Sequence, residues 1–180
     1  MDTITPIITA IGYNVARSPL EFGGGLNVIT EGVSDRYYLL AFLKMLNIND
    51  DISIIPSKGS STIHLLVSMS IGWGLNYIVF LDNDEGYKDA KDRLLDFYET
   101  EEKYEEYVYK VIRKQNSCIE DIFSAEDKKV FGIGSKRKDK ILNAKRFYDM
   151  IQKEEIIFED LHKETQENIS YVIQIINSKK

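Results

Sequence analysis

The sequence is poor in the residues that form covalent cross-links and zinc sites. Its 180 residues include one cysteine, Cys118, and two histidines. A single cysteine excludes an intrachain disulfide, and one cysteine with two distant histidines cannot form a structural zinc site. A chain without disulfides suits a reducing compartment, so we expect the protein to be cytoplasmic.

Long apolar runs are also missing. No stretch reaches the roughly 18 apolar residues that a membrane helix needs. The start of the chain lacks the basic region of a signal peptide. The composition, 43% hydrophobic and 29% charged, is that of an ordinary globular protein. We therefore expect no membrane partner and one domain with a core of its own.

Positive charge is scarce overall, because the net charge of −6 argues against a wholly basic nucleic-acid binder. Basic residues are nevertheless concentrated in residues 128–146, where eight of them accompany a single acid. A basic segment on an acidic body can bind a polyanion, but it is also common on solvated surfaces. Both interpretations stay open on composition alone.

The most informative stretch is a short apolar run followed by two aspartates. Tyr77–Leu81 is apolar without alternation, which predicts a central strand covered on both faces, as in a parallel α/β sheet. Asp82 and Asp84 follow it directly. Open α/β sheets place their ligands at the carboxyl ends of such strands, and two neighbouring carboxylates are well suited to a divalent cation. An acidic turn is the alternative.

Further acids follow other predicted strands. Leu26–Thr30 predicts a strand that ends at Glu31, and a buried helix with Ser34 as its N-cap and Asp35 in its first turn. Asp35 either serves as a capping acid or points with Glu31 into the crevice above the sheet. Residues 107–112 predict a strand shortly before Glu120-Asp121.

The remaining elements complete an α/β pattern. A strand over residues 52–55 leads into a loop where Lys58 is placed either to contact a phosphate or simply to face solvent. Ser60 or Ser61 is expected to cap the next helix, and another helix is expected from about Lys88. Residues 101–106 form an acidic stretch to which we assign no chemistry. Amphipathic helices are predicted over residues 138–151 and 164–177.

Two of these motifs together resemble the Toprim domain of topoisomerases, bacterial primases and related nucleases. They are Glu31-Gly32 after one strand and Asp82-x-Asp84 after a later strand. The resemblance implies a Toprim-like fold of class α/β. Its central, mostly parallel four-stranded sheet is flanked by helices and followed by a C-terminal helical extension. We divide the chain into a lead-in segment (1–25), the Toprim nuclease-like domain (26–150) and the extension (151–180).

The fuller pattern is similar to the nuclease domain of the OLD (overcoming lysogenization defect) family. It comprises Glu-Gly-x-Ser-Asp at residues 31–35, Ser-Lys-Gly at 57–59, the acidic segment 117–124, and Lys140 beside an Ala-x-x-Phe helix. OLD proteins usually carry an ATPase ahead of this domain, whereas the present sequence has no Walker motif. The resemblance thus implies an ATPase domain or subunit of OLD type outside this sequence, and a role in anti-phage defence.

The activity implied is hydrolysis of phosphodiester bonds in DNA, as an endonuclease or nickase that uses two metal ions. Oxygen ligands without cysteine or histidine favour Mg²⁺ or Mn²⁺. We expect the catalytic residues to be Glu31, Asp82, Asp84 and Lys140 or Lys136. The expected metal ligands are Glu31, Asp35 and Asp82 for one ion, and Asp84 with Glu120 or Asp121 near the second, with Ser117 orienting a ligand or water. Sequence-independent contacts to the DNA backbone are expected from Lys58, Lys136, Arg137, Lys138, Lys140 and Lys145.

Other interpretations of the motifs remain. A haloacid-dehalogenase-type phosphatase also places Asp-x-Asp after a strand, but there the motif opens the domain and Thr or Val usually follows it, whereas Glu85-Gly86 follows here. A calcium loop of EF-hand type fails because Gly86 stands one position too early. The Toprim fold can also serve as a non-catalytic docking or sensing module. The sequence leaves open whether the substrate is DNA or RNA and whether the chain forms an oligomer.

Overall fold

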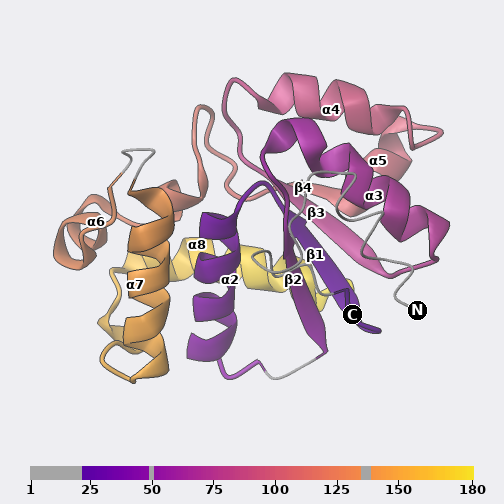
Figure 1. Ribbon diagram of the computed structural model, residues 1–180. Helices are drawn as coiled ribbons and strands as arrows, with labels where there is room; N and C mark the ends of the chain where they lie inside the picture. Colours follow the sequence, from indigo (N-terminus) through magenta and orange to yellow (C-terminus); the bar gives the residue numbers. More distant parts are fainter. Residues whose placement is uncertain (1–21, 49–50, 135–138) are drawn as a thin grey trace.

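The protein is built on a four-stranded parallel sheet. The computed structural model describes residues 22–48, 51–134 and 139–180. The strands β1 (Leu26–Thr30), β2 (Ile52–Pro56), β3 (Tyr77–Leu81) and β4 (Val108–Lys110) lie in the order β2-β1-β3-β4, with every pairing parallel. Figure 1 shows the sheet between two groups of helices. The expected Toprim-like α/β fold is therefore confirmed.

The strands are apolar without alternation because both faces of the sheet are buried. Side chains alternate between the two faces along a strand. In β3, Ile78 and Phe80 enter one hydrophobic cluster, whereas Tyr77, Val79 and Leu81 enter the other. All five of these residues are buried. A central parallel strand of this kind has no solvent face and needs no polar positions.

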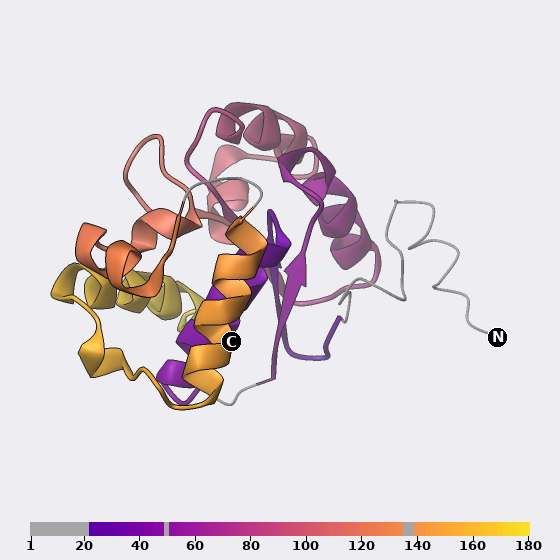
Figure 2. The ribbon, with the colours of Figure 1, turned by 60° about the vertical axis from the view of Figure 1, so that its left-hand side comes forward.

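One face of the sheet is covered by α2 (Val33–Met45), α7 (Lys140–Gln152) and α8 (Lys163–Asn177). Figures 1 and 2 both show α7 running alongside α2. Four aromatic rings fill the space between these elements, with centroids 5.0–6.4 Å apart: Tyr38, Phe42, Phe123 and Phe147. Phe123 brings the segment after β4 into the same core, so this segment is held firmly against α2 and α7.

The other face is covered by α3 (Ile63–Gly72), α4 (Tyr87–Leu95) and α5 (Glu101–Tyr107). The segment after β4 adds the 3₁₀ turn η2 (Ile119–Ile122) and the short helix α6 (Ala125–Phe131), and further 3₁₀ turns are η1 (Ser60–Thr62) and η3 (Phe158–Asp160). The chain just before η2 returns to β3 through an isolated bridge between Asn83 and Ser117. This bridge brings η2 next to the carboxyl end of β3.

Several local expectations need correction. Ser34 is not the N-cap, because α2 begins at Val33 and Gly32 occupies that position. The Asp35 carboxylate accepts from the Gly32 N–H and so satisfies the first turn. Neither Ser60 nor Ser61 caps α3, since the 3₁₀ turn η1 precedes that helix.

The fourth strand is shorter than its β-prone sequence. Residues 101–106 are helical rather than an unassigned acidic stretch, and β4 begins only at Val108. The Thr100 side chain accepts from the Lys103 N–H and starts α5. The division of the chain at residues 25 and 150 stays a prediction. In the described part of the chain, no helix has the length and apolar character needed to cross a membrane.

The aromatic cluster predicts a large stability effect at Phe147, which is 1% exposed. Replacing it with alanine leaves a cavity among Tyr38, Phe123 and Phe131, so Phe147→Ala should lower the free energy of unfolding by about 3–5 kcal/mol in urea denaturation. Ile141→Ala on the same helix, at a side chain 52% exposed, should stay within about 0.5 kcal/mol of wild type. Equal losses in the two variants would contradict this packing.

Candidate active site

The candidate site lies where the parallel strands end. Their carboxyl ends share one edge of the sheet, so residues that follow β1, β3 and β4 approach one another. Glu31 follows β1, Asp82 follows β3, and η2 is brought to the same edge by the Asn83–Ser117 bridge. Side chains distant in sequence therefore meet above β1 and β3, the two inner strands.

A chain of hydrogen bonds joins these three segments. The Asp82 N–H donates to Glu31 Oε1 over 2.8 Å, so Glu31 faces the end of β3. The Asp82 side chain in turn accepts from the Ile119 N–H at 3.0 Å, which ties β3 to η2. Both contacts connect residues far apart in sequence, so the geometry depends on the whole sheet rather than on one loop.

Asp35 joins this group from the first turn of α2. Its two oxygens accept from the Gly32 N–H at 2.9 Å and from the Ser34 hydroxyl at 3.1 Å. Its side chain is buried, as a capping group on an exposed helix would not be. Asp35 thus stabilises the start of α2 and also adds a carboxylate to the candidate site. A capping role and a place beside Glu31 are therefore compatible.

Glu120 and Lys140 complete the group. The Lys140 ammonium, at the start of α7, lies 3.0 Å from Glu120 Oε2. The other oxygen, Oε1, is buried and has no hydrogen-bond partner among the described residues, and the same is true of the Tyr38 hydroxyl. Glu31, Asp35, Asp82 and Glu120, with Lys140, are called the acidic site below.

Burial of the carboxylates and repulsion among them make their charged forms unfavourable in the acidic site. Burial, followed by the charges of Asp35, Glu31 and Glu120, raises the pKa of Asp82 to about 9. Burial likewise raises the pKa of Glu31 to about 7 and that of Asp35 to about 6. Burial opposes the charged form of Lys140, but the Glu120 carboxylate outweighs it and raises the pKa of Lys140. Among the described residues one lysine faces four acids, so further positive charge would stabilise the acidic site.

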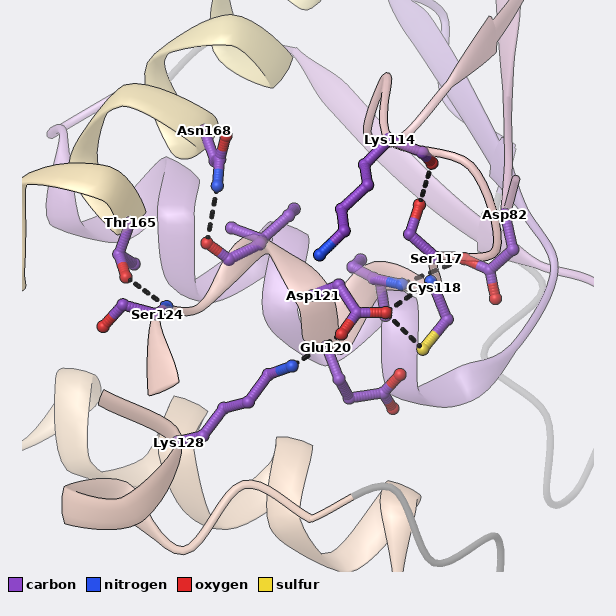
Figure 3. Close-up of polar contacts among 12 residues, drawn as sticks. Asp82, Lys114, Ser117, Cys118, Glu120, Asp121, Ser124, Lys128, Thr165 and Asn168 are labelled. Atoms are coloured by element: carbon purple, nitrogen blue, oxygen red, sulfur yellow. Dashed lines mark hydrogen bonds and ion pairs between the residues drawn. The ribbon is translucent and has the colours of Figure 1, made fainter. Parts of the chain in front are cut away.

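Two of the expected ligands point elsewhere. Asp121 pairs with Lys128 at 2.6 Å and accepts from the Cys118 N–H, as the dashed lines of Figure 3 show, while Glu120 extends away from it. Burial disfavours the Asp121 charge, but the hydrogen bonds from Lys128 and Cys118 and the charge of Lys128 together outweigh this and hold the pKa of Asp121 below its usual value. Asp84 is exposed and accepts from the Gly86 N–H at 2.8 Å, although its charge still raises the pKa of Glu31.

The other expected residues lie at the margin of the acidic site or outside the described residues. The buried Ser117 hydroxyl donates to the Lys114 carbonyl within its own loop. Lys58 is exposed on the loop after β2, and Lys145 is exposed on α7, paired with Asp149 at 2.6 Å. Lys136, Arg137 and Lys138 fall outside the described residues.

Sequence reasoning missed Tyr38 and Cys118. Burial and the nearby charges of Glu120 and Asp35 raise the pKa of the Tyr38 hydroxyl, which places it beside the acidic site. Its spacing of three residues from Asp35 on one helix was an available signal. Burial and the nearby Glu120 carboxylate raise the pKa of the Cys118 thiol, which donates to Asp121 at 3.5 Å. A lone cysteine carries no such signal in the sequence.

The carboxylates of the acidic site have the chemistry that a hard cation requires, but their oxygens are not placed around a common point. Across the described residues, no three Asp, Glu, His or Cys side chains are placed to hold a metal ion together. Their oxygens accept instead from backbone N–H groups and from Lys140. The donors are nevertheless all carboxylates, which Mg²⁺ and Mn²⁺ prefer, and the buried Glu120 Oε1 has no donor among the described residues.

The fold has a known counterpart. No protein-family profile and no curated protein matches the chain. Among solved structures, it is similar to the C-terminal region of the OLD protein of Burkholderia pseudomallei. The TM-score is 0.56 at 14% sequence identity, and the alignment covers 88% of this chain and 98% of that one. The likeness shows that the two share a fold, in agreement with the resemblance seen in the sequence motifs.

The raised pKa values predict how stability depends on pH in a chelating buffer. An acid whose pKa is raised on folding keeps its proton in the native state at pH values where the unfolded chain has lost it, so its contribution to stability is full below the unfolded value and is lost as the pH rises to the folded value. The free energy of unfolding should therefore fall from about pH 4, where these acids ionise in the unfolded chain, and level off only near pH 9, where Asp82 ionises in the folded protein. Asp82→Asn should flatten this fall in urea titrations, and parallel curves for the two proteins would contradict the assignment.

Proposed function

We propose that the protein is a divalent-metal-dependent nuclease that hydrolyses phosphodiester bonds in DNA. One observation carries the proposal: four carboxylates, on or directly after β1, α2, β3 and η2, lie close enough at the sheet edge to act on one another, with one lysine among them in the described part of the chain. Buried acids in excess of their cations are costly to fold and are retained where they bind positively charged ligands. The shared fold with the OLD protein region supports the same reaction class.

The carboxylates would divide between two ions of Mg²⁺ or Mn²⁺. Glu31, Asp35 and Asp82 would hold one ion, and Glu120 would serve the second, together with Asp84 once that side chain turned from the Gly86 N–H toward the acidic site. To bind, these side chains must exchange their present backbone and lysine partners for the cation. The ions would supply positive charge to the phosphate oxygens and to the attacking water. The backbone contacts among β1, β3 and η2 would keep the carboxylates in place throughout.

Among the described residues, Lys140 is the group placed to neutralise the phosphate directly, and Lys136, the other candidate, lies outside them. Lys140 lies at the start of α7, within the basic segment, with its ammonium 3.0 Å from Glu120. If a cation takes over Glu120, the ammonium is released toward a phosphate oxygen. A positive charge placed in advance where negative charge develops lowers the barrier to the reaction.

The substrate would be held by its backbone, without sequence recognition. Lys58 and Lys145 are exposed, and Lys136, Arg137 and Lys138 add to the same basic segment of the sequence. The similar Burkholderia structure is the C-terminal region of an OLD protein, hence part of a larger protein. We propose that an ATPase of OLD type, in the same or another chain, works with this nuclease in the cytoplasm and that the pair acts in anti-phage defence.

The proposal predicts metal-dependent nicking of plasmid DNA in Mg²⁺ or Mn²⁺. Glu31→Gln and Asp82→Asn should each lower the nicking rate by more than about a hundredfold, because each removes an anionic ligand. Asp92→Asn, at an exposed acid on α4, removes the same charge on the opposite face of the sheet and should cut like wild type. Gel electrophoresis of the supercoiled, nicked and linear forms measures the rates.

The outcomes of that assay separate the competing functions. Hydrolysis of a small phosphomonoester without nicking would favour a phosphatase of haloacid-dehalogenase type. Metal binding without cutting of any DNA or RNA, with and without a candidate ATPase, would favour a docking or sensing module. Nicking that persists in Glu31→Gln and Asp82→Asn would place the active centre elsewhere.

A second prediction concerns Lys140. Lys140→Met keeps the length of the side chain and removes its charge, so the nicking rate should fall about 10²–10³-fold, as when one group that stabilises transition-state charge is lost. Lys140→Arg should retain part of the activity. Lys145→Met, five residues along the same helix, should weaken DNA binding only slightly. Comparable loss of nicking in Lys140→Met and Lys145→Met would contradict a catalytic role specific to Lys140.

A further inference from the structure

A concave site lies on the other side of η2 from the acidic site. It is a cavity of about 580 Å³, within the range of small-ligand sites. Its lining includes Arg113, Lys114, Asp121, Phe123, Lys128 and Tyr171. None of these residues belongs to the acidic site. The volume is open to solvent and large enough to admit one nucleotide.

The turn η2 contributes one residue to each of the two sites. Glu120 contacts Lys140 in the acidic site, whereas the next residue, Asp121, lines the cavity and pairs with Lys128. The turn is held from α8, because Asn168 donates to the Ile122 carbonyl at 3.0 Å. Figure 3 shows this contact and the Asp121–Lys128 pair on the same turn. A ligand in the cavity would therefore lie one turn away from the proposed reaction.

The cavity offers positive charge in an otherwise acidic chain. Arg113 and Lys114 lie in the segment after β4, and neither has an ion-pair partner within the described parts of the chain. Asp121 does not cancel them, because Lys128 lies 2.6 Å from its carboxylate. Glu164 also lines the cavity, so three basic and two acidic side chains leave a positive excess. In Figure 3 the Lys114 side chain extends toward Asp121. Guanidinium and ammonium groups arranged in this way suit a phosphate group.

Aromatic surface accompanies these charges. The Arg113 guanidinium lies 4.7 Å from the centre of the Tyr171 ring, and Phe123 forms part of the buried lining. A nucleobase stacks favourably on a tyrosine ring or on a guanidinium plane, irrespective of its sequence. A phosphate-binding group and a stacking surface in one cavity are the two requirements for holding a nucleotide.

We propose that this cavity binds one unpaired nucleotide of the strand that is cut at the acidic site. The inference rests on the proposed function and adds that the enzyme engages a single-stranded or locally opened strand. Arg113 and Lys114 would contact the phosphate, and Tyr171 would stack on the base. The same chemistry would suit a free nucleotide, so the test includes both sources.

The test is a binding measurement that does not depend on cutting. Fluorescence anisotropy of a labelled oligothymidylate of about ten nucleotides is recorded in Ca²⁺, with a gel to check that the strand stays intact. Lys114→Gln and Tyr171→Leu should each weaken binding about tenfold, as the loss of one phosphate contact or one base stack would. Lys163→Gln, at an exposed lysine on α8, removes the same charge away from the cavity and should bind like wild type.

Three results would overturn the inference. The first is no binding of single strands by the wild type, and the second is an equal loss in Lys163→Gln and Lys114→Gln. The third is binding of thymidine monophosphate at micromolar concentration that the cavity variants weaken while oligonucleotide binding stays unchanged, which would indicate a free-nucleotide site. Thermal unfolding of each variant checks that the fold is intact.

The measurement also separates this inference from the nuclease proposal. If wild type nicks DNA in Mg²⁺ and the cavity variants bind and nick as wild type does, the cavity assignment fails and the nuclease proposal stands. If the cavity variants lose strand binding but wild type cuts no substrate with any metal, binding at the cavity stands and catalysis at the acidic site fails.

Discussion

The hydrogen bond from the Asp82 N–H to Glu31 is the contact on which the site depends. It fixes a carboxylate at the end of one inner strand against the backbone at the end of the other. Such a contact needs parallel strands in register and helices on both faces, which is what the two hydrophobic clusters supply. The core therefore acts as the rigid support that a precise arrangement of charged groups requires.

This arrangement works against stability. Three carboxylates with raised pKa values and a fourth with an unpartnered buried oxygen face one lysine within the described residues, and the unfolded chain would leave them in water. Proteins retain destabilising groups where function requires them and recover the lost stability in other parts of the fold. Here the compensation lies in the aromatic core, where Phe147 and Phe123 pack against Tyr38 directly beside the acidic site.

The sequence predicted the sheet and the strand ends well, because uninterrupted apolar runs followed by acids are a signal that survives without a structure. It could not separate Glu120 from Asp121, which are adjacent in sequence. Their roles depend on how η2 is rotated and on which lysine, Lys140 or Lys128, approaches each. It also could not foresee the cavity, whose lining comes from the segment after β4, η2, α6 and α8. Contacts between distant segments leave no local pattern.

Diffraction from crystals grown with Mn²⁺ tests the central claim most directly, because anomalous scattering locates the ion independently of activity. We expect an anomalous peak between Glu31 and Asp82, within bonding distance of both carboxylates, and a second beside Glu120 with Lys140 displaced from it. Density that leaves the Asp82 N–H, Glu31 and Lys140 contacts unchanged, with no anomalous peak at the sheet edge, would contradict the account.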